Sequence, residues 1–119
     1  MGILKTEYPC ALTMAMDLVG GKWKMVMLWH LRHGVLRFSE LKRLLPGITQ
    51  KMFTQQLREL EESGLIFRTV YPVVPPKVEY GLSEEGHALV PSLVKLCSWG
   101  NDYAKTHGIR NGCPPNSGS

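Results

Sequence analysis

The sequence predicts an α+β fold in which a helix-turn-helix is followed by a β-hairpin. Two helical segments are separated by the turn residues Pro46 and Gly47, and a short helix, a tight turn and a longer helix form a helix-turn-helix. Segment 65–71 is β-branched and aromatic, and segment 77–82 alternates between polar and apolar residues. The predicted fold class is therefore α+β, a winged helix-turn-helix with a two-stranded β wing and extra N- and C-terminal helices.

The N-terminal part of the chain is predicted to hold two helices that end at glycine. Residues 10–19 are mostly small and apolar and are followed by Gly20 and Gly21, which is typical of a short helix with a glycine stop. Residues 22–33 are apolar on nearly all sides and are followed by Gly34. We expect this second segment to be the central buried helix of the domain.

Capping residues indicate where the two helices of the helix-turn-helix begin. Ser39 is a candidate N-cap for the short first helix, in which leucines recur at helical spacing. Thr49 is the N-cap candidate for the longer helix, predicted over residues 50–63 and ended by Gly64. The apolar residues of the longer helix fall on one face and are predicted to pack inward. These residues are Met52, Phe53, Leu57 and Leu60.

A last helix is predicted over residues 84–107, with Ser83 as its N-cap. Pro91 lies inside this segment and is expected to kink the helix or to delay its start. The domain is expected to span residues 8–107, and residues 108–119 are predicted to be a disordered tail. Apolar residues of the last helix are the expected contact surface for a second copy of the chain. They are Leu89, Leu93, Leu96, Trp99 and Tyr103.

The distribution of charge favours an anionic partner. The formal net charge is +4 and the isoelectric point is about 9.1. Between Lys22 and Arg58 the chain holds eight basic residues and a single acid, Glu40. A clustered basic surface is typical of nucleic-acid binding, and a solvated helix face is the alternative explanation. The eight basic residues are Lys22, Lys24, Arg32, Arg37, Lys42, Arg43, Lys51 and Arg58.

The outer face of the longer helix suits double-stranded DNA. Glutamine can pair with the edge of adenine, and arginine and lysine can pair with guanine in the major groove. The helix N-terminus and a hydroxyl beside it suit a phosphate. Acids at the other end of the helix, Glu59, Glu61 and Glu62, are expected to point away from DNA. The candidate DNA-reading residues are Thr49, Gln50, Lys51, Thr54, Gln55 and Arg58.

Three further cations are candidates for contacts with the DNA backbone. Arg37 and Lys42 precede the turn, and Lys77 lies beside the predicted hairpin tip. Lys77 has a structural alternative, because an exposed charged residue at a strand edge also blocks unwanted strand pairing. The longer helix has one as well, since Gln, Lys and Arg are good helix formers that an ordinary surface helix also carries.

Two sequence motifs resemble the HxlR family of bacterial winged-helix regulators. Residues 20–23 read Gly-Gly-Lys-Trp, and residues 50–60 read Gln-Lys-Met-Phe-Thr-Gln-Gln-Leu-Arg-Glu-Leu. The likeness covers roughly residues 8–105. It implies a homodimer that is assembled through the first and last helices and binds a pseudo-palindromic operator, with repression as the commoner outcome. It also implies recognition by the residues named above in the longer helix, with a wing contact at Lys77.

Cys10 is the candidate sensor of an oxidant or a small electrophile. Some relatives in the family use a cysteine at this position, although they often carry Cys-Pro, whereas here Pro9 precedes Cys10. A thiol near a helix start is favoured as a thiolate, and the alternative is a buried, inert thiol. Cys97 lies among apolar residues and is expected in the core, and Cys113 falls in the predicted tail.

Several functional classes lack support in the sequence. No set of a nucleophile, a base and an acid stands out, and no glycine-rich phosphate loop is present, so an enzyme is not expected. His30 and His33 lack a third ligand at suitable spacing, so neither a metal nor another cofactor is expected. No apolar run approaches the roughly 18 residues that span a membrane, which favours a cytoplasmic protein. The alternative function is a winged-helix protein-interaction adaptor without specific DNA binding.

Overall fold

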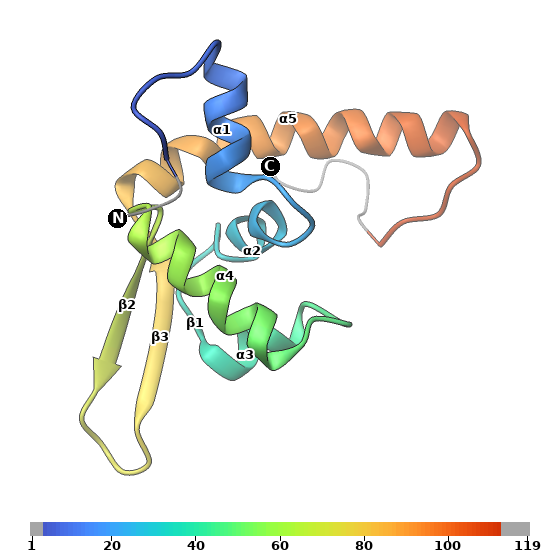
Figure 1. Ribbon diagram of the computed structural model, residues 1–119. Helices are drawn as coiled ribbons and strands as arrows, with labels where there is room; N and C mark the ends of the chain where they lie inside the picture. The colour runs from blue at the N-terminus through green and yellow to red at the C-terminus, as the bar shows by residue number, and fades with distance from the viewer. Residues whose placement is uncertain (1–3, 113–119) are drawn as a thin grey trace.

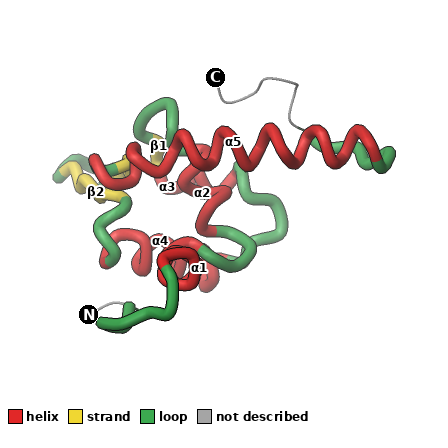
Figure 2. Tube along the Cα trace, turned by 90° about the horizontal axis from the view of Figure 1, so that it is seen from above, coloured by secondary structure: helices red, strands yellow, loops and turns green. Residues whose placement is uncertain are grey.

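The computed structural model describes residues 4–112, which form five helices and three strands. Helix α5 is the longest element, and its C-terminal half extends beyond the rest of the domain (Figures 1 and 2). The helix-turn-helix and the wing lie on the other side of the molecule from α5 (Figure 1). The elements are α1 (Ala11–Val19), α2 (Lys24–His30), β1 (Leu36–Arg37), α3 (Phe38–Arg43), α4 (Gln50–Glu62), β2 (Ile66–Tyr71), β3 (Lys77–Leu82) and α5 (Glu84–Thr106).

The predicted winged helix-turn-helix is confirmed, with one addition to its sheet. Strands β2 and β3 form the antiparallel hairpin of the wing, with Ile66 opposite Leu82 and Tyr71 opposite Lys77. Strand β1 pairs antiparallel with the other edge of β3, so the described residues form a three-stranded sheet in the order β1-β3-β2. The prediction of a two-stranded sheet was therefore incomplete. A strand of two residues is too short to show the alternation that identifies strands in a sequence.

The core lies between α2, the helix-turn-helix and the base of the sheet. Met27 and Leu28 of α2 are fully buried, as are Phe53 and Leu60 of α4. The ring of Phe38 contacts that of Phe53 edge to face, with the centroids 4.9 Å apart, an arrangement that aromatic pairs prefer. This packing fixes α4 by its inward face and leaves its outward face free for a partner.

Two predicted caps are confirmed, and they fix the starts of α4 and α5. The Thr49 hydroxyl accepts a hydrogen bond from the Met52 N–H at 3.1 Å, and the Ser83 hydroxyl accepts one from the Gly86 N–H at 3.1 Å. The Ser83 hydroxyl also donates to the Gly64 carbonyl at 2.6 Å, directly after α4. Ser83 therefore joins the end of α4 to the start of α5.

Three predicted details of the helices are wrong. Arg37, not Ser39, caps α3, because the Arg37 N–H donates to the Glu40 carboxylate at 2.8 Å and the helix begins at Phe38. Met52 is 39% exposed, since it lies about 100° around the helix from Phe53, which fills the core. The central helix is also shorter than predicted, Lys24–His30.

Helix α5 is continuous through Pro91 and begins at Glu84. The proline therefore does not delay the start of the helix. The helical turns that precede Pro91 in the sequence are stabilised in two ways. Ser83 caps the helix, and two acids in the first turn complement the helix dipole. Residues 108–112 continue from α5 without helix or strand, and the remainder of the predicted tail lies outside the described residues.

Candidate nucleic-acid interface

The outward face of α4 brings the predicted DNA-reading residues together. Capping by Thr49 starts the helix, and burial of Phe53 and Leu57 turns the opposite side chains toward solvent. Most of the predicted residues on this face are exposed, and Thr54 is half-buried. A shallow groove of about 670 Å³ runs along them. It is lined by Gln50, Lys51, Thr54, Gln55 and Arg58, with Glu59 and Glu62 at its end.

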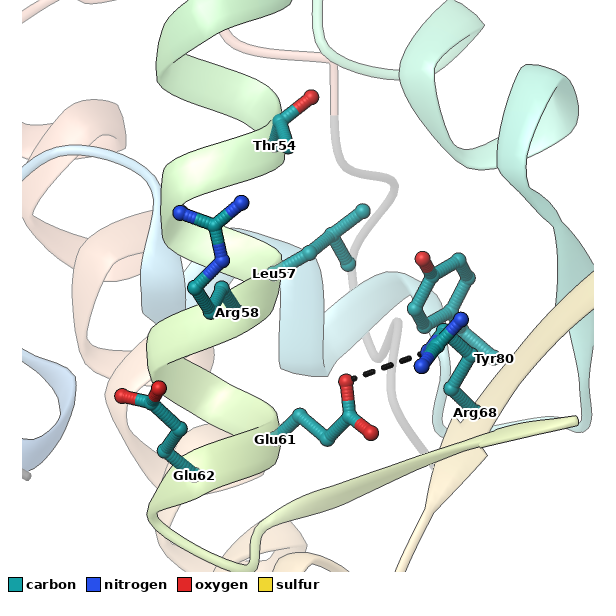
Figure 3. Close-up of a pocket in the computed structure, with 7 residues that line it drawn as sticks. All are labelled: Thr54, Leu57, Arg58, Glu61, Glu62, Arg68 and Tyr80. Carbon is teal, nitrogen blue, oxygen red and sulfur yellow. Dashed lines mark ion pairs between the residues drawn. The ribbon is translucent and has the colours of Figure 1, made fainter. Parts of the chain in front are cut away.

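A second cavity lies between α4 and the wing, where Thr54 and Arg58 of α4 share it with Arg68 of β2 (Figure 3). The Arg68 guanidinium lies 3.4 Å from the Glu61 carboxylate. Sequence reasoning missed Arg68 because a strand residue gains a role only from the element it faces. Glu61 and Glu62 also line this cavity, and the expectation that the acids of α4 point away from DNA stays a prediction.

Arg37 and Lys77 lie together in a different place. Both line a groove between the start of α3 and the wing tip, and Tyr71 of β2 lines it as well. Arg37 is exposed and is paired in register with Glu79 of β3. Lys42, the remaining predicted backbone contact, is half-buried on α3 and lines neither groove. The predicted cations therefore divide between α4, α3 and the wing.

Lys77 has partners within the wing. Its ammonium lies 4.3 Å from the centroid of the Tyr71 ring and 3.8 Å from the Glu79 carboxylate. The Tyr71 hydroxyl donates to the same carboxylate at 3.1 Å, and this hydrogen bond raises the pKa of Tyr71. Beyond these residues the tip is apolar, with Val74 98% exposed. The Glu79 carboxylate therefore neutralises part of the positive charge of Lys77.

Lys24 was counted with the basic surface, and this interpretation is wrong. Its ammonium is buried and lies 2.6 Å from the Glu59 carboxylate, which joins α2 to α4. The hydrogen bond from Lys24 lowers the pKa of the Glu59 carboxyl. Arg32 is also engaged, since its guanidinium lies 3.7 Å from the centroid of the Trp29 ring. The partner of Lys24 was missed because Glu59 lies on a different helix, whereas Trp29 precedes Arg32 by three residues, within reach along the chain.

Cys10 is exposed at the N-cap of α1, so the alternative of a buried thiol is wrong. Its sulfur lies 3.2 Å from the Thr13 hydroxyl oxygen. This hydrogen bond, with further ones from the backbone N–H groups of Thr13 and Leu12, lowers the pKa of the Cys10 thiol. Cys97 is half-buried on α5, and Cys113 lies outside the described residues.

Within residues 4–112, no group of three His, Cys, Asp or Glu side chains lies close enough to hold a metal ion. His30 is half-buried, and burial, followed by the nearby Arg32 charge, lowers its pKa. None of the described helices is long and apolar enough to cross a membrane.

The fold and the residues of α4 define a winged-helix transcriptional regulator. The chain matches the family described as HxlR-like helix-turn-helix over residues 18–108 and belongs to this family. An uncharacterized helix-turn-helix transcriptional regulator of Bacillus subtilis, YtcD, is 57% identical over 99 residues, which are 83% of this chain and 79% of that protein. An uncharacterized regulator from Methanothermobacter thermautotrophicus is 55% identical over 97 residues, 82% of this chain and 74% of that protein.

Solved structures of transcriptional regulators superpose on this chain, and one of them is named a redox regulator. The redox regulator HypR in its reduced form superposes with a TM-score of 0.79 at 42% identity, covering 83% of this chain and 98% of that chain. The reduced form of the Bacillus subtilis transcriptional regulator YodB superposes with a TM-score of 0.70 at 32% identity, covering 83% and 97%. These relatives are named as regulators rather than as enzymes.

Proposed function

We propose that this protein is a sequence-specific repressor that binds a pseudo-palindromic operator in double-stranded DNA as a homodimer. The observation that supports it best is α4, whose capped N-terminal half exposes amides and cations along one groove. Amide and guanidinium groups match the hydrogen-bonding edges of bases in the major groove. A helix N-terminus also attracts a phosphate. The backbone contacts are proposed at Arg37, Lys42 and Lys77, and Lys51, predicted as a base-reading residue, is proposed to contact a phosphate as well.

The homodimer is proposed to form through α1 and α5. The C-terminal half of α5 extends past the domain (Figure 2) and carries exposed apolar side chains. Leu96, Trp99 and Tyr103 are 51%, 62% and 47% exposed, and the two aromatic rings are stacked with centroids 5.3 Å apart. Exposed apolar surface of this kind marks an interaction site. Two-fold symmetry would place the two copies of α4 about 34 Å apart, one turn of DNA.

Cys10 is proposed to control DNA binding through its oxidation or its alkylation by a small electrophile. The thiol is exposed, and its lowered pKa raises the fraction of thiolate, which is the reactive form. The relationship to HypR, a redox regulator, supports the same proposal. Because Cys10 precedes α1, a modification there changes the helix that is proposed to join the two copies.

The proposal is tested by selection of genomic fragments. The reduced protein is incubated with fragmented genomic DNA from its source, and the retained fragments are sequenced with and without mild oxidant. We expect a short inverted repeat to be enriched by the reduced protein and lost after oxidation. The Cys10→Ser variant is the matched control, and it should retain the repeat under both conditions.

The same experiment separates the parts of the proposal. Enrichment that oxidant does not change would keep the DNA-binding regulator and remove Cys10 as its sensor. Uniform weak retention that vanishes as the salt concentration rises would indicate phosphate attraction alone. That result would overturn specific DNA binding and favour the protein-interaction adaptor. A sedimentation experiment that finds a stable monomer would overturn the homodimer.

A further inference from the structure

Three polar side chains connect the buried side of α4 to its exposed face. The Lys24 ammonium lies 2.6 Å from one oxygen of the Glu59 carboxylate, and the Gln55 side-chain amide donates to the other oxygen at 3.2 Å. The Lys24 side chain is only 5% exposed and that of Glu59 is 25% exposed. Gln55 itself is exposed and lines the groove on the outward face of α4. The exposed amide is therefore anchored to a buried cation.

The chemistry of these groups fixes which way the Gln55 amide faces. An ionised carboxylate only accepts hydrogen bonds, so the amide must turn its nitrogen toward Glu59 and its oxygen away. Without such a partner the amide can rotate by half a turn, which exchanges donor and acceptor. In the anchored orientation one N–H and the carbonyl oxygen remain available. These are the donor and the acceptor that pair with the N7 atom and the amino group of adenine.

We infer that Glu59, held in place by Lys24, is a positioning residue that orients the Gln55 amide for adenine. This inference rests on the DNA binding proposed above. The competing explanation is that the ion pair between Lys24 and Glu59 only joins α2 to α4. The two explanations differ in one measurable respect. A positioning role acts through Gln55, so it vanishes when Gln55 is replaced, whereas a structural role does not depend on Gln55.

The test is a thermodynamic cycle of three variants. The first is Gln55→Ala, the second carries Lys24→Met with Glu59→Leu, and the third combines all three changes. Both charges are replaced together because removal of one partner would leave the other charge buried and unpaired. The matched control carries Arg68→Met with Glu61→Leu, which removes the ion pair that joins α4 to β2.

The probe is the duplex that the wild-type protein enriches from a randomised library, compared with duplexes that differ from it at single base pairs. Gln55→Ala identifies the base pair that Gln55 reads, where we expect it to remove a preference of about tenfold. At that base pair the double variant should lower the preference to about twofold or threefold. In a protein that already carries Gln55→Ala, the same double change should have no further effect on the preference at this base pair. The control alters a cavity that Gln55 does not line, so it should leave the preference at the Gln55 base pair intact even where it changes the overall affinity.

A second variant tests the orientation directly. The Glu59→Gln variant places at this position a side chain of nearly the same shape. The single amide oxygen of the new side chain is expected to accept a hydrogen bond from Lys24, and its amide nitrogen then faces Gln55. The Gln55 amide must then turn over to accept, which places its nitrogen outward. We expect the preference for adenine at this base pair to be lost. Because the buried Lys24 ammonium then lacks a countercharge, thermal melting should fall, and binding is measured below the melting transition of the variant.

The outcomes distinguish this inference from the proposed function. If the wild-type protein enriches no sequence, the proposed function is overturned, and the inference with it. If a sequence is enriched but the double variant keeps its preference at the Gln55 base pair, only the positioning role is overturned. Additive effects of the double variant and Gln55→Ala would also overturn it. Thermal melting of each variant confirms that the folded state is being compared.

Discussion

Helix α4 and the wing present different surfaces to a partner. The N-terminal half of α4 exposes hydrogen-bonding groups, and the Lys51 ammonium has no ion pair among the described residues. In the wing the Lys77 ammonium is near Glu79, and the tip is apolar around Val74. Base recognition requires side-chain donors and acceptors, which α4 supplies. The wing is better suited to contacts with the shape and backbone of DNA.

The largest effect is expected from changes on the outward face of α4. Gln55→Ala combined with Arg58→Ala should reduce affinity for the selected duplex by about a hundredfold or more, because each paired contact with a base is worth about 1–3 kcal/mol. Binding to unrelated DNA at low salt should fall much less. Fluorescence anisotropy with both duplexes measures the two affinities. Retention of specificity by this variant would show that α4 does not read the bases.

The cap of α4 should have the next largest effect. Thr49→Ala removes the acceptor for the Met52 N–H and should lower the free energy of unfolding by about 1 kcal/mol. Urea denaturation followed by circular dichroism measures this change. Thr6→Ala is a suitable control because Thr6 is exposed and precedes α1. Equal stability of the two variants would contradict the proposed role of the cap.

Two lysine substitutions compare the helix and the wing directly. Lys51→Ala should reduce the slope of log affinity against log salt by about 0.9, the value expected for one phosphate contact. Lys77→Ala should reduce it by less than about half as much, because Glu79 already neutralises part of its charge. Titrations at several salt concentrations give both slopes. Equal reductions of the slope by the two variants would show that the lysine of the helix and the lysine of the wing contribute equally to phosphate binding.

The smallest expected effect is a fall in stability at low pH that arises from the Glu59 carboxyl. Its folded-state pKa lies below the ordinary value of 4.5 because Lys24 donates to it. The resulting stabilisation is complete above the ordinary pKa and is lost as the pH falls through the folded-state value. Lowering the pH from 6 to 3 should therefore reduce the free energy of unfolding of the wild-type protein more than that of the variant with Lys24→Met and Glu59→Leu. Urea denaturation at each pH measures both. If the stability of the two proteins falls equally as the pH is lowered, ionisation of Glu59 is not the cause of the pH dependence.

The sequence predicted best what depends on local periodicity and capping. Helix α4, with its Thr49 cap and the inward placement of Phe53 and Leu57, follows from helical spacing over 13 residues. Both wing strands and the Ser83 cap of α5 were predicted for similar reasons. These features are properties of continuous segments, which a sequence displays directly.

Features that depend on contacts between distant segments were not predicted. The pairing of β1 with β3 needs only two residues, and its existence depends on the position of β3. Lys24 appeared to be a surface cation because its partner, Glu59, is 35 residues further along the chain. Arg68 joins the cavity beside α4 only because the wing folds back toward the helix. In each case tertiary packing decides the role of the residue.

The hydrogen bonds around Ser83 have a consequence for how a signal can act. Its hydroxyl donates to Gly64, and its N–H donates to the Leu65 carbonyl at 3.0 Å. A side chain at Gly86 would meet the same carbonyl, since an added Cβ would lie 2.2 Å from it. The end of α4, the base of the wing and the start of α5 are therefore joined into one tightly packed unit. In the dimer proposed above, we expect a signal received at α1 or α5 to change the distance and angle between two such units rather than the shape of each.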